Sequence, residues 1–257
     1  MRVRGYAAGT PCWAAVASPD AAATHAFYGA LFGWTLADDR FALDGRAVAG
    51  VREQGSGPAA WLISISTDDS TATAQAVRSA GGRVRSAPVQ IAGRAELASD
   101  GTFAVFTDPA GATFATWQRA GFFGAQVSFE PGAICWYELS AHDLSVVDDF
   151  YSEVFGWRVL EAESAPGDPY FEFHHHGDTV AGLLPIDHRF PSKETPAHWT
   201  VCFMVDDCVT ACDRIVELGG FVARKPMPVA AGWYARVADL HGAHFAVIEL
   251  SDEFRVD

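Results

Sequence analysis

A glutamate and a histidine on two predicted strands could form an acid–base pair. Alternation along a strand gives Glu138 the same face as Trp136, and gives His244 the same face as Ala246. If those faces line one cavity, the carboxyl group and the imidazole could exchange a proton with a bound molecule. Two alternatives remain open: His244 hydrogen-bonds a ligand carbonyl or hydroxyl, or both residues are structural.

Three consecutive histidines, His174 to His176, raise the question of a metal site. Alternation sends His174 and His176 to one face of a strand and His175 to the other, so at most two imidazoles could share an ion. The run lies beside a turn at Gly177. We therefore expect the solvated tip of a hairpin rather than a metal centre.

The elements that position these residues occur in a tandem repeat. At an offset of 123 residues, nine identities align without a gap: Gly9, Cys12, Trp13, Asp20, Phe27, Tyr28, Phe32, Gly33 and Trp34 match Gly132, Cys135, Trp136, Asp143, Phe150, Tyr151, Phe155, Gly156 and Trp157. A repeat of this kind indicates a duplicated structural unit. We predict two domains, residues 1–124 and residues 125–257.

Each half has the same order of hydrophobic patterns. Val147, Phe150, Tyr151 and Val154 recur at the spacing of an amphipathic helix, with Asp143 where an N-cap is expected. Short alternating runs before and after it predict one strand and then three strands. The same order of strand, helix and three strands recurs within each half, which gives four βαβββ modules.

This pattern, with FYxxxFGW after the first strand of each half and DPAG or DLHG before the last strand, resembles the vicinal-oxygen-chelate superfamily of glyoxalases, ring-cleaving dioxygenases and bleomycin-resistance proteins. The segments PCW…FYGALFGW and AICWYEL…FYSEVFGW are similar to the tandem, glyoxalase-like branch. The resemblance implies an α+β fold in which paired modules form one cup per half. It also connects the chain to accessory proteins of anthracycline biosynthesis.

Metal-using members of that family carry His or Glu ligands on the first and last strands of each module. The corresponding positions here are Trp13, Leu62, Ala115 and a residue near Ala49 in the first half, and Trp136, Thr200, Ala246 and a residue near Ala181 in the second. None of these side chains is a strong ligand for a divalent ion. We therefore predict no metal and no cofactor.

Strand alternation assigns aromatic and small side chains to both cups. Flat rings offer stacking surfaces to a planar ligand, although the same tryptophans could simply fill the cups as core. The predicted ligand-binding residues are Trp13, Leu62, Thr113, Trp117, Trp136, Glu138, Thr200, Met204 and His244, with Trp233 in a loop at the rim.

Composition narrows the function classes. The 257 residues carry 32 acidic and 18 basic side chains, a net charge of −14, which disfavours nucleic acid and anionic membranes as partners. No apolar run is long enough to span a bilayer and no secretory signal is evident, so we expect a cytoplasmic protein. Five cysteines without a CxxC pair are typical of buried thiols in a reducing compartment. Either a monomer or a homodimer is compatible with two cups in one chain.

These observations favour a metal-independent protein that binds a planar aromatic molecule, such as an anthracycline or related polyketide, for sequestration, self-resistance or assistance of a pathway oxygenase. On this hypothesis, Trp13→Ala and Trp136→Ala should both weaken binding. The alternative is an enzyme, a glyoxalase-like lyase or a hydroxylase or oxygenase that uses Glu138 and His244 in the second cup.

Overall fold

A computed structural model describes residues 1–37, 40–55, 57–92, 99–162, 169–187, 190, 192 and 194–255. The first half contains β1 (Pro11–Ser18), α1 (Ala21–Phe32), β2 (Thr35–Ala37), β3 (Arg40–Leu43), β4 (Arg46–Glu53), β5 (Ala60–Ser66), α2 (Ser70–Ser79), β6 (Arg83–Ala92), β7 (Ser99–Thr107) and β8 (Thr113–Arg119). This order is two βαβββ modules in succession, as the sequence predicts.

The second half repeats the same order. It contains β9 (Ile134–Ala141), α3 (Leu144–Phe155), β10 (Arg158–Glu161), β11 (Phe171–His175), β12 (Asp178–Pro185), β13 (His198–Met204), α4 (Cys208–Glu217), β14 (Phe221–Val229), β15 (Gly232–Ala238) and β16 (His244–Leu250), followed by a short 3-10 helix, Asp252–Phe254. The predicted α+β class with four modules is confirmed. None of the helices in the described part of the chain has the length and apolar character required to cross a bilayer.

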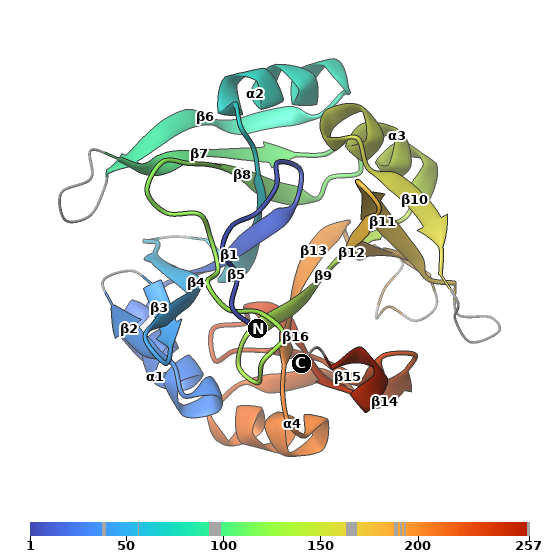
Figure 1. The fold of residues 1–257 in the computed structure, drawn as a ribbon. Coiled ribbons are helices and arrows are strands. Elements are labelled where there is room, and N and C mark those ends of the chain that lie inside the picture. The colour runs from blue at the N-terminus through green and yellow to red at the C-terminus, as the bar shows by residue number, and fades with distance from the viewer. Residues whose placement is uncertain are drawn as a thin grey trace.

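Each half forms one eight-stranded mixed sheet (Figure 1). The strand order is β2-β3-β4-β1-β5-β8-β7-β6 in the first half and β10-β11-β12-β9-β13-β16-β15-β14 in the second. The two modules of a half meet through antiparallel pairing of their first strands, β1 with β5 and β9 with β13. The predicted domain boundary at residues 124 and 125 falls between β8 and β9.

Capping residues fix where the four helices begin. Asp20, Asp69, Asp143 and Asp207 have extended backbones, and each side chain accepts a hydrogen bond from an amide of the first turn. The glycines of the two FYxxxFGW motifs, Gly33 and Gly156, end α1 and α3 in the left-handed conformation.

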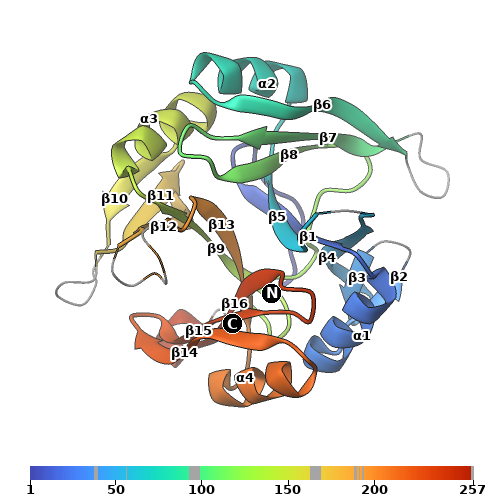
Figure 2. The ribbon, with the colours of Figure 1, turned by 180° about the vertical axis from the view of Figure 1, so that it is seen from behind.

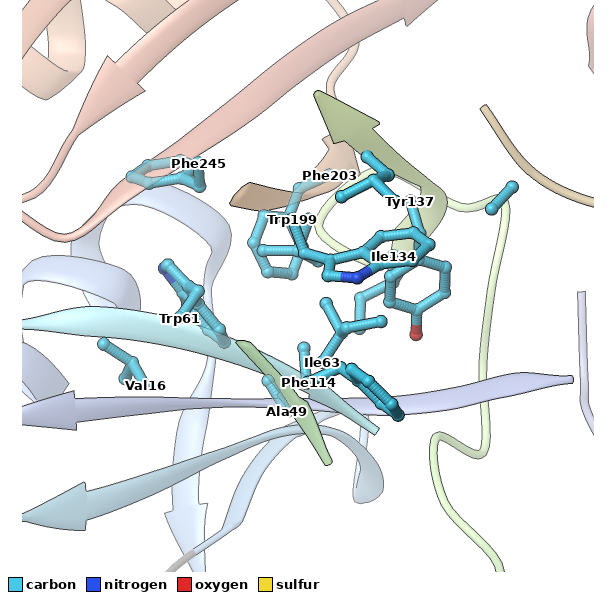
Figure 3. Packing of buried hydrophobic residues seen from close by; sticks show 14 of the residues in the cluster. Val16, Ala49, Trp61, Ile63, Phe114, Ile134, Tyr137, Trp199, Phe203 and Phe245 are labelled. Carbon is cyan, nitrogen blue, oxygen red and sulfur yellow. The ribbon is translucent and has the colours of Figure 1, made fainter. Parts of the chain in front are cut away.

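The two halves share one hydrophobic core. Helix α1 contacts α4 and α2 contacts α3, and strands of the two sheets meet between them (Figures 1 and 2). Side chains from the two sheets interleave there; Trp61, Ile63 and Phe114 of the first half pack beside Trp199, Phe203 and Phe245 of the second (Figure 3). The helix-covered faces of the two sheets therefore pack against each other in this core. The opposite face of each sheet, which we call its cup, is turned away from the core.

Reciprocal hydrogen bonds join the halves within that core. The Tyr28 hydroxyl donates to Asp239 at 3.1 Å, and the Tyr151 hydroxyl donates to Asp108, also at 3.1 Å. Each tyrosine comes from an FYxxxFGW motif and each aspartate from the DPAG or DLHG motif of the other half. Burial raises the pKa of Asp108. The two sequence motifs of the repeat thus serve the contact between the halves.

Candidate functional site

A phenylalanine of the same half packs into the first cup. Phe122, three residues after β8, is only 8% exposed, and its ring lies edge-on to Trp13 with 5.0 Å between ring centroids. The Trp117 indole nitrogen donates to the Phe122 carbonyl oxygen at 2.7 Å. Trp13 and Trp117, both predicted to bind a ligand, contact a phenylalanine side chain of the same half.

The guanidinium group of Arg40 lies over the ring of Phe122. The guanidinium carbon of Arg40 lies 3.8 Å from the centroid of the Phe122 ring, and Arg40 also forms an ion pair with Asp100. The other predicted residues of this cup lie apart from Phe122's contacts: Thr113 is exposed at the start of β8, and Leu62 is half-buried on β5. These contacts favour the alternative that the tryptophans of the first cup serve as core.

The second cup has a polar floor. Glu138 of β9 pairs with Thr200 of β13 and with Gly182 of β12, and Trp136 pairs with Cys202. Glu138, Thr200 and Met204 are all buried. These sequence-predicted residues are therefore brought together on one face of the second sheet.

Trp136 remains half-buried at one side of this floor. Its indole nitrogen donates to the Tyr170 hydroxyl at 2.7 Å. A side chain at Gly182 would collide with that hydroxyl, so the absence of a Cβ at Gly182 is what allows Tyr170 to reach Trp136. Tyr170 was not predicted, because it lies outside the alternating runs that assign residues to the cup.

A second group that the sequence did not assign to the cup centres on Arg236. Its guanidinium donates to the Tyr234 hydroxyl at 3.2 Å and to the Ser140 hydroxyl at 3.1 Å, and its third nitrogen lies 3.4 Å from His198 Nε2. Tyr234 and Arg236 alternate along β15 and pair with Ile248 and Ala246 of β16. The same alternation rule that found Glu138 could have found them.

His244 lies on the same face as Glu138 but at a distance. Cys202 pairs with Ala246, so two residues earlier Thr200 comes level with His244, between that histidine and Glu138. The backbones of Glu138 and His244 are therefore two strand spacings apart, about 10 Å. His244 is exposed and its ring packs edge-on against Phe221 at 5.4 Å. Desolvation, and then the charge of Arg236, lowers its pKa.

Burial raises the pKa of Glu138, opposed by the nearby Arg236 charge and by a hydrogen bond from Tyr234. The unfolded chain then loses this proton at a lower pH than the folded chain. The contribution of Glu138 to the free energy of unfolding is thus greatest below the ordinary glutamate pKa, and it decreases as the pH rises through the raised value.

Glu138→Gln should remove that dependence. We expect the variant to become more stable relative to the wild type as the pH rises from about 4 to about 7, since only the wild type must keep a buried carboxyl protonated or ionise it. Thermal melts across this range measure the difference. Glu217→Gln, at a side chain 65% exposed, is the control. A constant difference between wild type and Glu138→Gln at every pH would contradict the raised pKa.

A pocket of about 230 Å³ lies beside Trp136, where the N-terminal segment and the β11–β12 hairpin meet β9. It is lined by Tyr6, Phe129, Cys135, Trp136, His175, Val180 and neighbouring residues. The expectation of a solvated hairpin tip is wrong for His175, which is buried and whose Nε2 lies 2.9 Å from the Ala8 carbonyl oxygen. Its Nδ1 has no partner in the described part of the chain.

Trp233 lies apart from these groups. Trp233 is 46% exposed. It is next to Tyr234 on β15, so its side chain points to the face of the sheet opposite the second cup. There it lines a surface groove with Pro228, Glu249 and Arg255. Tyr234, and not Trp233, is the aromatic residue of β15 that faces the second cup.

Comparison with known proteins identifies the family. Residues 133–247 match the family model of the glyoxalase/bleomycin resistance protein/dioxygenase superfamily, and residues 13–116 match that of the glyoxalase-like domain. The chain is 36% identical to the anthracycline biosynthesis protein DnrV of Streptomyces peucetius, covering 97% of this chain and 96% of that protein. It belongs to the glyoxalase/bleomycin resistance protein/dioxygenase superfamily. The anthracycline biosynthesis protein DauV of Streptomyces sp. strain C5 is 34% identical over the same shares.

Solved members of the superfamily have the same fold. The Mn(II)-bound glyoxalase of Novosphingobium aromaticivorans superposes with a TM-score of 0.61 and 18% identity, covering 97% of this chain and 86% of that one. The 2,3-dioxygenase LapB of Pseudomonas sp. KL28 gives a TM-score of 0.60 with 16% identity, covering 93% and 91%. At these identities the likeness concerns the fold.

The cup-facing side chains do not fit a metal ion of the kind that some superfamily members hold. On β4 and β12 the cup-facing positions are Gly50 and Gly182, while Ala49 and Ala181, near which the ligand positions were expected, are buried in the shared core. Trp136, Thr200 and Ala246 occupy the other strand positions of the second cup. Among the described residues there is no group of three His, Cys, Asp or Glu side chains placed to hold a metal ion.

Proposed function

We propose that this chain is a cytoplasmic, metal-independent protein that binds a planar aromatic ligand of the anthracycline or related polyketide class. The observation that carries the proposal is the half-buried indole of Trp136 beside a pocket, in a chain whose full-length relatives are anthracycline biosynthesis proteins. Binding would serve to sequester the molecule or to present it to a pathway oxygenase.

The chemistry of the second cup supports a ligand that is aromatic and carries oxygen. An indole can stack on a planar ring, which contributes roughly 0.5–1.5 kcal/mol beyond the burial of its area. The hydroxyl groups of Tyr170 and Tyr234 can donate to carbonyl and hydroxyl oxygens, and the carboxyl group of Glu138 can accept from a hydroxyl group. Burial raises the pKa of both tyrosines, so these phenols remain donors.

The dimensions support one binding site with the ligand only partly enclosed. The pocket of about 230 Å³ beside Trp136 is smaller than the roughly 300–1,000 Å³ typical of sites for drug-sized molecules. One end of a polycyclic ligand would enter it, with His175 Nδ1 as a hydrogen-bonding group, and the remainder would extend along the second cup. The first cup, which Phe122 fills, would not take part.

Trp136→Ala should weaken the binding of a hydroxyanthraquinone at least about tenfold, because the stacking surface and the buried area are both lost. Fluorescence quenching on titration of the purified protein measures the affinity. Trp13→Ala is the matched control from the other half. Since Trp13 packs on Phe122, we expect it to lower the melting temperature and to leave the affinity within about twofold.

Equal losses of affinity in the two variants would contradict the assignment of the site to the second cup. No saturable quenching in the wild-type protein would contradict the binding function itself. Bound metal is measured on the same sample by elemental analysis, and a stoichiometric transition metal would contradict metal independence.

A second candidate is an enzyme, a glyoxalase-like lyase or a hydroxylase or oxygenase acting in the second cup. The raised pKa of Glu138 favours it, because a buried carboxyl group can serve as a general acid. The backbones of Glu138 and His244 lie about 10 Å apart, which leaves room for a molecule between the two side chains. Product analysis distinguishes the candidates: conversion of the ligand that is lost in Glu138→Gln supports the enzyme, and unchanged ligand supports binding.

A further inference from the structure

We propose that Arg236 binds an anionic oxygen of the ligand, a phenolate or a carboxylate, in the second cup. The inference rests on the proposed function and adds to it the charge of the ligand group and the residue that recognises it. Arg236 is half-buried on β15, on the face it shares with Tyr234 and opposite Ala246 of β16.

Arg236 forms no direct ion pair with a described residue, although the charge of the nearby Glu138 carboxyl group also acts on it. Its hydrogen-bond partners are the hydroxyl groups of Tyr234 and Ser140 and the ring of His198, all uncharged groups. None of the acidic side chains in the described ranges forms an ion pair with it. Desolvation lowers the pKa of His198, which keeps that ring neutral. A half-buried guanidinium in this setting favours an anion as its remaining partner.

The guanidinium is held in a defined position. The guanidinium carbon of Arg236 lies 4.8 Å from the centroid of the Phe190 ring, and that ring is also edge-on to His198. Two hydrogen bonds fix the rotation of the guanidinium plane. An arginine that is already oriented loses less conformational freedom when it binds an oxygen anion than a free surface arginine would.

The groups that face Arg236 from the other strands are compatible with a bound anion. Burial raises the pKa of Glu138 of β9, while the charge of Arg236 and a hydrogen bond from Tyr234 oppose that shift. Tyr170 and Tyr234 keep their protons and can donate. Arg224 of β14 adds a second positive charge near Glu138, and His244 of β16, whose pKa is lowered, adds none at neutral pH.

The first half shows that this polar group is not needed to build the cup. The strand positions equivalent to Glu138, Thr200, Tyr234 and Arg236 are occupied there by Ala15, Leu62, Phe103 and Val105. Val105 pairs with Ala115 as Arg236 pairs with Ala246. The two sheets therefore have the same register at these positions, with apolar side chains in the first and polar ones in the second. The duplicated scaffold therefore folds with apolar residues at these positions, and the polar set is confined to the second cup.

The test compares two probes of nearly identical shape, anthraquinone-2-carboxylate and the neutral anthraquinone-2-carboxamide, by quenching titrations. Arg236→Gln should raise the Kd of the carboxylate at least about tenfold, and that of the carboxamide by less than about threefold. Arg236→Lys should keep part of the preference. Arg214→Gln removes the same charge from the outer surface of α4 and should alter neither affinity.

A second readout reports the charge directly. The absorption band of 1,2-dihydroxyanthraquinone moves to longer wavelength when a hydroxyl ionises, so its pKa can be followed when it is bound. We expect the bound dye to ionise at a lower pH than the free dye in the wild type, and the shift to disappear in Arg236→Gln. A merely structural role for Arg236 would change affinity without moving this pKa.

The outcomes separate this inference from the proposed function. Equal weakening of both probes in Arg236→Gln, or a bound dye that ionises at the same or a higher pH than the free dye, overturns the role of Arg236 while the binding function stands. Failure of every probe to bind the wild-type protein overturns both.

Discussion

Trp157→Ala lowers the free energy of unfolding by about 3–5 kcal/mol, the range for removal of a fully buried aromatic side chain. Trp157 is completely buried, it stacks on Tyr151 at 5.1 Å, and its indole nitrogen donates to the Gly9 carbonyl oxygen of the other half at 2.7 Å. The substitution therefore removes core volume and a hydrogen bond between the halves at the same time. Chemical denaturation followed by circular dichroism measures the loss.

The matched control for Trp157→Ala is the same substitution at Trp233, which is 46% exposed. We expect that change to remain within about 0.5 kcal/mol. Since the two halves share one core, calorimetry of the wild type should show a single transition. Two separate transitions, or a loss of less than about 1 kcal/mol in Trp157→Ala, would contradict the shared core.

Phe122→Ala is expected to cost about 3–5 kcal/mol and to open the first cup. The phenylalanine ring packs against Trp13 and Trp117, and the guanidinium group of Arg40 lies over it. Its removal leaves a space lined by two indoles, and an apolar cavity of this kind can accept a flat aromatic molecule. The hydrogen bond from Trp117 to the backbone oxygen of residue 122 remains possible in the variant.

Isothermal titration calorimetry with a hydroxyanthraquinone tests this consequence of Phe122→Ala. The wild type should bind one molecule and the variant two, the second more weakly because the space left by one phenyl group encloses only part of a three-ring ligand. Phe254→Ala, at a ring 48% exposed, is the control and should change neither stoichiometry nor stability. An unaltered stoichiometry together with an unaltered melting temperature would show that Phe122 does not fill the first cup.

The repeat and the capping pattern made most of the fold predictable. The nine identities at one offset locate equivalent elements in both halves, and Asp20 and Asp143 cap helices as expected. Alternation also placed Trp136 and Glu138 correctly on one face, because both lie on a regular strand. The period of two is a local property, and a single strand is enough to reveal it.

The content of each cup was less predictable, since it depends on contacts between distant segments. Phe122 lies in an apolar linker, where no period indicates that it turns back onto Trp13 and Trp117. Tyr170 reaches Trp136 only because Gly182 lacks a side chain. His175 was assigned to solvent from its place beside a turn, and contact with Ala8 buries it. Such tertiary contacts override local pattern.

The reciprocal hydrogen bonds between Tyr28 and Asp239 and between Tyr151 and Asp108 form the kind of interface that two identical subunits would make. Here a peptide linker joins the two sides, so their association does not depend on protein concentration. In a pair of identical subunits each substitution would appear in both cups, whereas in this chain it appears in one. Covalent linkage thus allows Phe122 to pack into one cup while the other cup contains Arg236 and Glu138.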